Sequence, residues 1–316
     1  MSVRILVVIG PTASGKTRLG VEVARRLGSE ILSADSRQTY RGLNIGSGKD
    51  LDAYRQVKPP VPYHLIDVEE PTQIYSLFRF QQDCYDLIET KSRERRFAQG
   101  VPLLMVGGSG LYIEAVLNGY RIADVPEDVE LRKSLMERDH ADLIRELDRL
   151  DPRQESQTDR ASKKRVVRAI EIARYALHHE VVYSSPPSVP FDYAVFGIDI
   201  PRNELARRID IRLDQRLQQG LIDEVRDLLR AGVTVARMNQ LGLEYREVTA
   251  YLTGTKTEQQ MLDDLRRGIR QFAKRQRTRF RGLPARGIDV TWIGPDDYGA
   301  LLNHEFPYPG RLPGVE

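Results

Sequence analysis

A glycine-rich loop between an apolar run and an amphipathic stretch places the strongest limit on what this chain can fold into. The apolar run covers residues 4–9, and such a run is typical of a strand buried on both faces of a parallel sheet. Residues 10–17 read Gly-Pro-Thr-Ala-Ser-Gly-Lys-Thr, and residues 16–27 then place apolar side chains at helical spacing. This strand–loop–helix order predicts a P-loop, in which a chain segment wraps around a phosphate group.

The residues of this loop supply the groups that a phosphate needs. Glycines let backbone N–H groups turn inward, the start of the helix adds partial positive charge, and Lys16 adds a full one. Thr17 offers a hydroxyl to Mg²⁺, the expected cofactor. The predicted phosphate ligands are Gly10, Pro11, Thr12, Ala13, Ser14, Gly15, Lys16 and Thr17. By itself the loop indicates a bound di- or triphosphate and favours ATP or GTP.

The rest of the chain predicts a doubly wound, mostly parallel α/β sheet with a helical insertion domain. Further strands are expected at residues 30–34, 63–68, 101–106, 193–200 and 288–293, with helices over 77–97 and 202–250. Residues 124–180 place apolar side chains only at helical spacing. The predicted parts are a core over 1–122, a helical insertion over 123–192, a second part of the core over 193–295 and a tail over 296–316.

Composition excludes several classes of protein. With 316 residues, 41% hydrophobic and 29% charged, the chain is long enough for one large or two smaller globular domains. The N-terminal apolar run is far shorter than the ~20 residues of a membrane span and lacks the features of a signal peptide. The single cysteine, Cys84, excludes an intramolecular disulfide and a cysteine-based zinc site. We therefore expect a cytoplasmic monomer that does not contact membranes.

The surroundings of the loop differ from those of a nucleotide hydrolase. The apolar strand that ends at Val106 leads into Gly107-Gly108 instead of the aspartate that holds Mg²⁺ in such enzymes. Asp35 is the nearest carboxylate that follows a predicted strand, and ligands bind at this edge of open α/β sheets. Asp35 could serve as a base or a partner of Mg²⁺-bound water, or it could cap the following turn.

Eight segments, in the same order along nearly the whole chain, resemble the tRNA dimethylallyltransferases, also called tRNA isopentenyltransferases. The loop is the first of these segments. The others are Ser33–Tyr40 with Leu43–Gly46, Pro62–Asp67, Pro102–Tyr112, Arg165–Glu171, Arg208–Arg212, Gly220–Val225 and Ala273–Arg281. Eight ordered matches are far more specific than one phosphate loop.

The resemblance implies a substrate and a chemistry. The expected donor is dimethylallyl diphosphate, not ATP, and the expected acceptor is N6 of adenosine 37 in the anticodon stem-loop of tRNA. Asp35 corresponds to the general base of the family and Arg212 to the arginine that grips the diphosphate. Ser109 stands where the family usually has threonine, and we expect it to contact the reacting base or its sugar. Taken alone, Arg212 also fits a solvated helix face shared with Arg207, Arg208 and Arg216.

Basic segments fit a nucleic-acid substrate. Residues 266–286 contain nine Lys and Arg and no acidic residue, and residues 163–168 form a second basic cluster on the insertion. The expected tRNA-binding residues are Asp35, Ser36, Arg37, Gln38, Ser109, Arg132, Lys164, Arg165, Arg168, Lys274, Arg275, Gln276 and Arg281. The target adenine has to leave its stack to reach the allylic carbon.

Other functions remain open from the sequence. A cytokinin-type adenylate isopentenyltransferase would need neither basic segment, and a small-molecule kinase would bind ATP. An RNA-binding module without activity would not need an intact Lys16, Thr17 and Asp35. The chain departs from the family pattern at Gly46–Asp50, Gly242–Glu247 and Thr278–Arg281, outside the residues expected to carry the chemistry.

Overall fold

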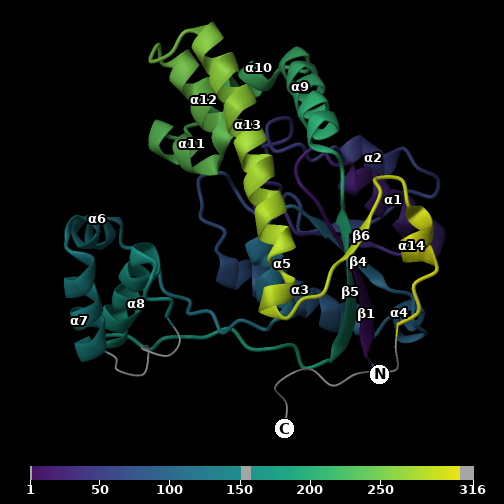
Figure 1. The fold of residues 1–316 in the computed structure, drawn as a ribbon, viewed down its shortest axis with the longest axis horizontal. Coiled ribbons are helices and arrows are strands. Elements are labelled where there is room, and N and C mark those ends of the chain that lie inside the picture. Colours follow the sequence, from purple (N-terminus) through teal and green to yellow (C-terminus); the bar gives the residue numbers. More distant parts are fainter. Residues whose placement is uncertain (1, 151–157, 307–316) are drawn as a thin grey trace. The chain divides into compact units, whose positions relative to one another are not determined.

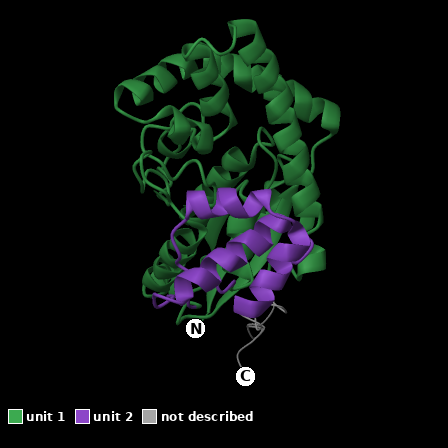
Figure 2. Ribbon diagram, turned by 90° about the vertical axis from the view of Figure 1, so that its left-hand side faces the viewer, with its two compact units in different colours: residues 1–119, 186–316 green, residues 120–185 purple. Residues whose placement is uncertain are grey.

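The computed structural model describes residues 2–150 and 158–306, and it separates the chain into two compact units. Unit 1 combines residues 1–119 and 186–316, and unit 2 is residues 120–185 (Figure 2). Unit 2 overlaps the segment 123–192 that the sequence predicts as an insertion, but it begins three residues earlier and ends seven residues earlier. Residues 307–316 of the predicted tail lie outside the described residues.

A parallel sheet of six strands forms the centre of unit 1 (Figure 1). The strands are β1 Val3–Ile9, β2 Ile31–Ser33, β3 Tyr63–His64, β4 Leu103–Gly107, β5 Phe191–Ile198 and β6 Thr291–Ile293. Their order is β3-β2-β4-β1-β5-β6, and every neighbouring pair is parallel. The predicted α/β class is confirmed, and β1 ends at the phosphate loop between its neighbours β4 and β5.

Helices cover both faces of this sheet, because the side chains of β1 alternate between two hydrophobic cores. Val3, Ile5, Val7 and Ile9 face one core, whereas Leu6 and Val8 face the other. The first core includes buried residues of α3 (Leu77–Ser92) and α5 (Gly110–Leu117). The second includes those of α1 (Lys16–Leu27) and α14 (Tyr298–Leu302). This alternation produces the doubly wound arrangement that the apolar strand run predicts.

Unit 1 contains further helices between and after the strands. They are α2 Leu51–Arg55, α4 Arg95–Ala98, α9 Arg202–Gln218, α10 Leu221–Arg230, α11 Val235–Leu241, α12 Leu243–Leu252, α13 Glu258–Arg281 and the short 3₁₀ helix Pro284–Arg286. Helix α13 begins with a capping box in which Thr257 and Gln260 exchange hydrogen bonds. It packs against α9, α12 and α5, and Figure 1 shows it returning from the outer helices to the sheet.

Unit 2 is helical and has a small core of its own. Its helices are α6 Val129–Glu137, α7 His140–Leu150 and α8 Lys163–Ala176. Leu135, Leu143 and Leu147 pack with Val166 and Ile170 of α8. None of the helices within residues 2–150 and 158–306 has the length and hydrophobicity needed to cross a membrane.

Four predicted elements differ from the structure. The helix predicted over 202–250 is divided into α9, α10, α11 and α12, with Gly220, Gly232 and Gly242 between them. The strand predicted over 63–68 stops at His64, because Leu65 and Asp67 have φ angles of 62° and 56°, which no strand residue adopts. The helix predicted over 77–97 is divided into α3 and α4. The first part of the predicted tail contains α14, whose N-cap Asp297 accepts a hydrogen bond from the backbone N–H of Ala300.

Candidate active site

The phosphate loop has the backbone geometry that an anion site requires. Ala13 and Gly15 have φ angles of 63° and 94°, so the chain turns sharply and directs successive N–H groups inward. Gly15 is the N-cap of α1, and no side chain caps this helix. The first N–H groups of α1 are therefore free of a capping side chain and can receive an anion instead.

Lys16 lies among charges of both signs. Loss of water around its ammonium group lowers the pKa of Lys16 to about 8. Asp35 and Asp50 oppose this effect by attraction, whereas Arg212 and Arg216 strengthen it by repulsion. These four side chains therefore lie close enough to the loop to influence the charge of Lys16, the residue that would contact a bound diphosphate.

Asp35 and Ser109 meet where β2 and β4 end. Ser109 donates its backbone N–H to the carbonyl of Ala34 at 3.1 Å, and its Oγ accepts the backbone N–H of Ser36 at 2.9 Å. Asp35 Oδ1 accepts the backbone N–H of Arg37 at 3.1 Å, which fixes the carboxylate within its turn. The segments that follow two neighbouring strands are thus joined by hydrogen bonds, and one carries a carboxylate and the other a hydroxyl.

The close approach of β2 and β4 explains the glycine after the second of these strands. A Cβ added at Gly107 would lie 2.0 Å from the carbonyl oxygen of Ala34. A side chain at this position, including an aspartate, would push the two strand ends apart. Glycine is therefore required where the two backbones touch. The carboxylate at this edge of the sheet is Asp35, which follows the neighbouring strand β2.

Two cavities border on the phosphate loop. One of about 350 Å³ is lined by Asp35 and Ser109 together with residues of α5 and α13. The other, of about 920 Å³, is lined by the outer side of the loop, the segment around Asp50 and α9. Both cavities are lined by Lys16, Thr17, Arg212 and Arg216. Lys16 of the loop and the two arginines of α9 therefore lie between the smaller cavity, which contains the candidate base, and the larger one.

Arg212 and Arg216 lie one turn apart on α9 and both point to this site. Arg212 pairs with Asp50 at 2.5 Å, and Arg216 pairs with the buried Glu244 at 3.3 Å. Arg216 is only 7% exposed, so the helix face that it shares with Arg212 is not simply a solvated one. Glu244 also pairs with Arg37 at 3.1 Å, and this shared carboxylate joins the Asp35 turn to α9.

Two of the residues predicted to contact tRNA are buried and satisfied within the protein. Gln38 accepts a hydrogen bond from the Ser33 hydroxyl at 2.9 Å and donates to the Gly48 carbonyl at 3.1 Å. Gln276 on α13 donates to the Gly108 carbonyl at 2.9 Å and accepts the backbone N–H of Thr12 at 2.8 Å. Both amides line the 350 Å³ cavity and connect its walls.

The other predicted tRNA contacts of unit 1 are more accessible. Lys274, Arg275 and Arg281 are exposed on α13, and Arg281 also forms a long ion pair with Asp199 at 3.7 Å. Ser36 and Arg37 are partly buried and line the same cavity as Asp35. The basic segment thus has an exposed face and a face that packs against the core, as its apolar residues predict.

In unit 2, the predicted contacts divide in the same way. Arg132 and Arg168 are partly buried and both pair with Glu171, which is 2% exposed. Lys164 and Arg165 are exposed at the start of α8. Arg132 and Arg168 therefore balance the charge of a buried carboxylate within unit 2, whereas Lys164 and Arg165 face solvent.

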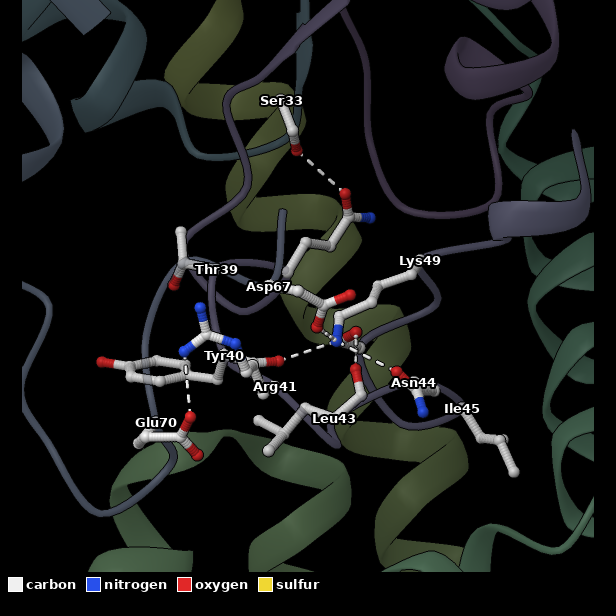
Figure 3. A network of polar contacts seen from close by, with 12 residues as sticks. Ser33, Thr39, Tyr40, Arg41, Leu43, Asn44, Ile45, Lys49, Asp67 and Glu70 are labelled. Carbon is white, nitrogen blue, oxygen red and sulfur yellow. Dashed lines mark hydrogen bonds and ion pairs between the residues drawn. The ribbon is translucent and has the colours of Figure 1, made fainter. Parts of the chain in front are cut away.

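The sequence interpretation missed the anchors of the loop over residues 43–50. Glu224 accepts the backbone N–H groups of Asn44, Ile45 and Gly46 at 2.6–3.0 Å. Lys49 is 1% exposed and donates to the Tyr40 carbonyl, to Asn44 Oδ1 and to Asp67 (Figure 3). The only sequence signals were that Glu224 falls in a matching segment and that Lys49 falls in a departure from the family pattern.

The donors near the loop fit a Mg²⁺ ion that is shared with a diphosphate. Among the described residues there is no group of three His, Cys, Asp or Glu side chains that could hold a metal on its own. Mg²⁺ commonly takes one or two protein oxygens and completes its shell with phosphate and water. The Thr17 hydroxyl, on the wall of both cavities, suits that kind of site.

The parallel sheet and its loop define the P-loop class of α/β proteins. Family comparison goes further: the IPP transferase family model matches residues 38–283, and the isopentenyl transferase model matches residues 3–57. The chain therefore belongs to the IPP transferase family, as the eight ordered segments predict.

Individual relatives agree over nearly the whole length. A tRNA dimethylallyltransferase 1 of Syntrophus aciditrophicus is 43% identical over 95% of this chain and 97% of its own. A tRNA dimethylallyltransferase 2 of Syntrophotalea carbinolica is 44% identical over 93% and 95%. The solved tRNA isopentenylpyrophosphate transferase of Bacillus halodurans has a TM-score of 0.67 at 30% identity and covers 96% of this chain and 95% of its own.

Proposed function

We propose that this chain is a tRNA dimethylallyltransferase that moves a dimethylallyl group from dimethylallyl diphosphate to N6 of adenosine 37. The observation that carries this proposal is the shared wall of the two cavities. Asp35 and Ser109 line the same cavity as Lys16, Thr17 and Arg212, so a base and an anion site face one space. A nucleotide hydrolase would need an acidic metal ligand after β4, and Gly107 takes that place.

The loop binds the diphosphate and stabilises it as it leaves. When the bond between C1 of the dimethylallyl group and the bridging oxygen breaks, its electron pair stays on the diphosphate. The N–H groups at the start of α1, with Lys16 and Arg212, stabilise this growing charge. The pKa of Lys16, about 8, leaves its ammonium form dominant at neutral pH. Thr17 would hold Mg²⁺ through its hydroxyl, and the ion would supply further positive charge to the diphosphate.

Asp35 accepts the proton that N6 has to lose. The lone pair of N6 forms the new bond to C1, and the proton passes to the Asp35 carboxylate, which leaves neutral N6-dimethylallyl adenosine and diphosphate. The hydrogen bond from the backbone N–H of Arg37 fixes one carboxylate oxygen. The Oγ of Ser109 accepts the Ser36 N–H. From this position Ser109 orients the adenine base or its sugar.

The accessible cations recognise the tRNA. Lys274 and Arg275 on α13 line a basic groove of about 470 Å³ with Arg279 and Arg286. This groove suits a phosphate backbone, because guanidinium and ammonium groups bind phosphate oxygens without reading sequence. In unit 2, Lys164 and Arg165 provide exposed cations of the same kind. The anticodon stem-loop is the part of tRNA that presents adenosine 37.

Mass spectrometry of nucleosides tests this function directly. The protein is incubated with Mg²⁺, dimethylallyl diphosphate and an anticodon stem-loop RNA, and a matched RNA with guanosine at position 37 is the control. We expect a gain of one dimethylallyl group on adenosine in the first RNA alone. Modification of free AMP in place of RNA would support the adenylate isopentenyltransferase instead, and phosphate transfer from ATP would support a kinase.

A further inference from the structure

Asp50 makes an unusual contact for its position in the chain. It is the N-cap residue of α2, where an aspartate usually accepts a hydrogen bond from the first turn of its own helix. Its backbone is left-handed, with φ 50° and ψ 44°, and its side chain makes no capping bond. The carboxylate instead binds Nη2 of Arg212 at 2.5 Å.

The loop that carries Asp50 is anchored by the two residues before it, so this contact is built into the fold. Lys49, the preceding residue, is held by the Tyr40 carbonyl, Asn44 and Asp67 (Figure 3). Gly48 adds a second constraint, because a Cβ there would lie 2.6 Å from Arg212 Nη2. The segment thus fits closely against Arg212 and delivers the Asp50 carboxylate to it.

Asp50 stands where it can compete with the substrate anion. It lines the 920 Å³ cavity together with Lys16, Arg212 and Arg216. Arg216 pairs with the buried Glu244. Arg212 instead pairs with Asp50, whose side chain is 51% exposed, and the Arg212 side chain is itself 26% exposed. A guanidinium binds a phosphate group as readily as a carboxylate, often through two parallel hydrogen bonds.

We propose that Asp50 is an internal counter-anion of Arg212 that the diphosphate displaces, so that this carboxylate sets how tightly the site holds the diphosphate product. The inference rests on the proposed function, in which Arg212 grips the diphosphate. In the empty site Asp50 balances the charge of Arg212 beside two other cations. When the diphosphate has to leave, the returning carboxylate replaces its contact with Arg212 and eases release.

Titration calorimetry with inorganic pyrophosphate and Mg²⁺ tests this role. We expect Asp50→Asn to bind pyrophosphate about fivefold more tightly than the unaltered chain, the size expected from the loss of one competing, partly exposed ion pair. Asp52→Asn is the matched control: it removes the same charge from the same cavity, and no ion pair among the described residues joins Asp52 to Arg212. Its affinity should stay unchanged.

Two further variants make the result decisive. Asp50→Gly removes the carboxylate and suits the left-handed backbone, so it replaces Asp50→Asn if the latter does not fold. In an Arg212→Ala background, Asp50→Asn should no longer change the affinity. Unchanged or weaker pyrophosphate binding in both Asp50 variants overturns the inference, as does an equal gain in Asp52→Asn. Absence of pyrophosphate binding by the unaltered chain would instead contradict the proposed function itself.

Discussion

Gln276 accepts the backbone N–H of Thr12 at 2.8 Å, although the two residues are 264 positions apart in the chain. The same amide donates to the Gly108 carbonyl at 2.9 Å. One side chain of α13 therefore joins the phosphate loop to the loop after β4. The helix that carries the exposed cations for RNA is thereby connected directly to the anion site.

Replacing Gln276 by Ala should weaken diphosphate binding. The change leaves the Thr12 N–H and the Gly108 carbonyl without their partner, and each lost buried hydrogen bond costs about 1–3 kcal/mol. Part of this cost should appear as an approximately tenfold loss of pyrophosphate affinity, measured by titration calorimetry. Gln271→Ala, an exposed position on the same helix, is the control and should have no effect. A loss of RNA affinity with intact pyrophosphate binding would make Gln276 an RNA contact instead.

Replacing Asp35 by Asn should reduce turnover while substrates still bind. The amide keeps the shape of the side chain but cannot accept the N6 proton, and base assistance is worth about 10²–10⁴-fold. Single-turnover rates with a stem-loop RNA measure the chemical step, and filter binding measures RNA affinity, which should stay within a few-fold. If Asp35→Asn reacted at the normal rate, Asp35 would not be the base.

Replacing Lys274 and Arg275 together by Ala should weaken RNA binding and reduce its dependence on salt. Each phosphate contact contributes about 0.7–0.9 to the slope of log K against log salt concentration, so the slope should fall by about one to two. Arg226→Ala with Arg230→Ala removes the same charge from α10, where both arginines pair with aspartates three residues before them. The slope of this control should not change. An unchanged slope in the first variant would mean that α13 does not contact phosphates.

Local patterns in the sequence were sufficient for the loop, the strands and the general position of Asp35. The P-loop residues are consecutive, and an apolar strand with a following amphipathic helix is recognisable wherever it occurs. The edge at which parallel strands end also follows from the topology, which places Asp35 near the loop. Residue roles within the site came from the family resemblance.

The contacts that complete the site depend on tertiary packing. Arg212 and Arg216 belong to the same basic run of α9, and only the position of Glu244 on α12 explains why Arg216 is buried. Gln276 follows two cations on α13, but its partners are residues of two distant loops. The turn after β3 also escaped prediction, because the positive φ of Leu65 has no signature in its residue type.

The buried Glu171 should make the stability of unit 2 depend on pH. Burial alone would raise the pKa of this carboxyl, but hydrogen bonds from Arg132, Arg168 and the Asp128 N–H outweigh it and lower the pKa below the ordinary 4.5. A carboxyl with a lowered folded pKa stabilises the fold above its ordinary pKa, and this contribution disappears as the pH falls through the folded pKa.

Glu171→Gln should therefore destabilise the chain by about 2 kcal/mol at pH 7, since Arg168 loses its carboxylate partner and Arg132 keeps, among the described residues, only that of Glu127. Urea unfolding of the full chain, followed at several pH values, measures the difference from the unaltered chain. The difference should be constant from pH 7 to about pH 5 and shrink below the ordinary carboxyl pKa. Glu137→Gln, at an exposed end of α6, should show no such difference. A constant difference down to the lowest pH would mean that packing, and not charge, is what Glu171 contributes.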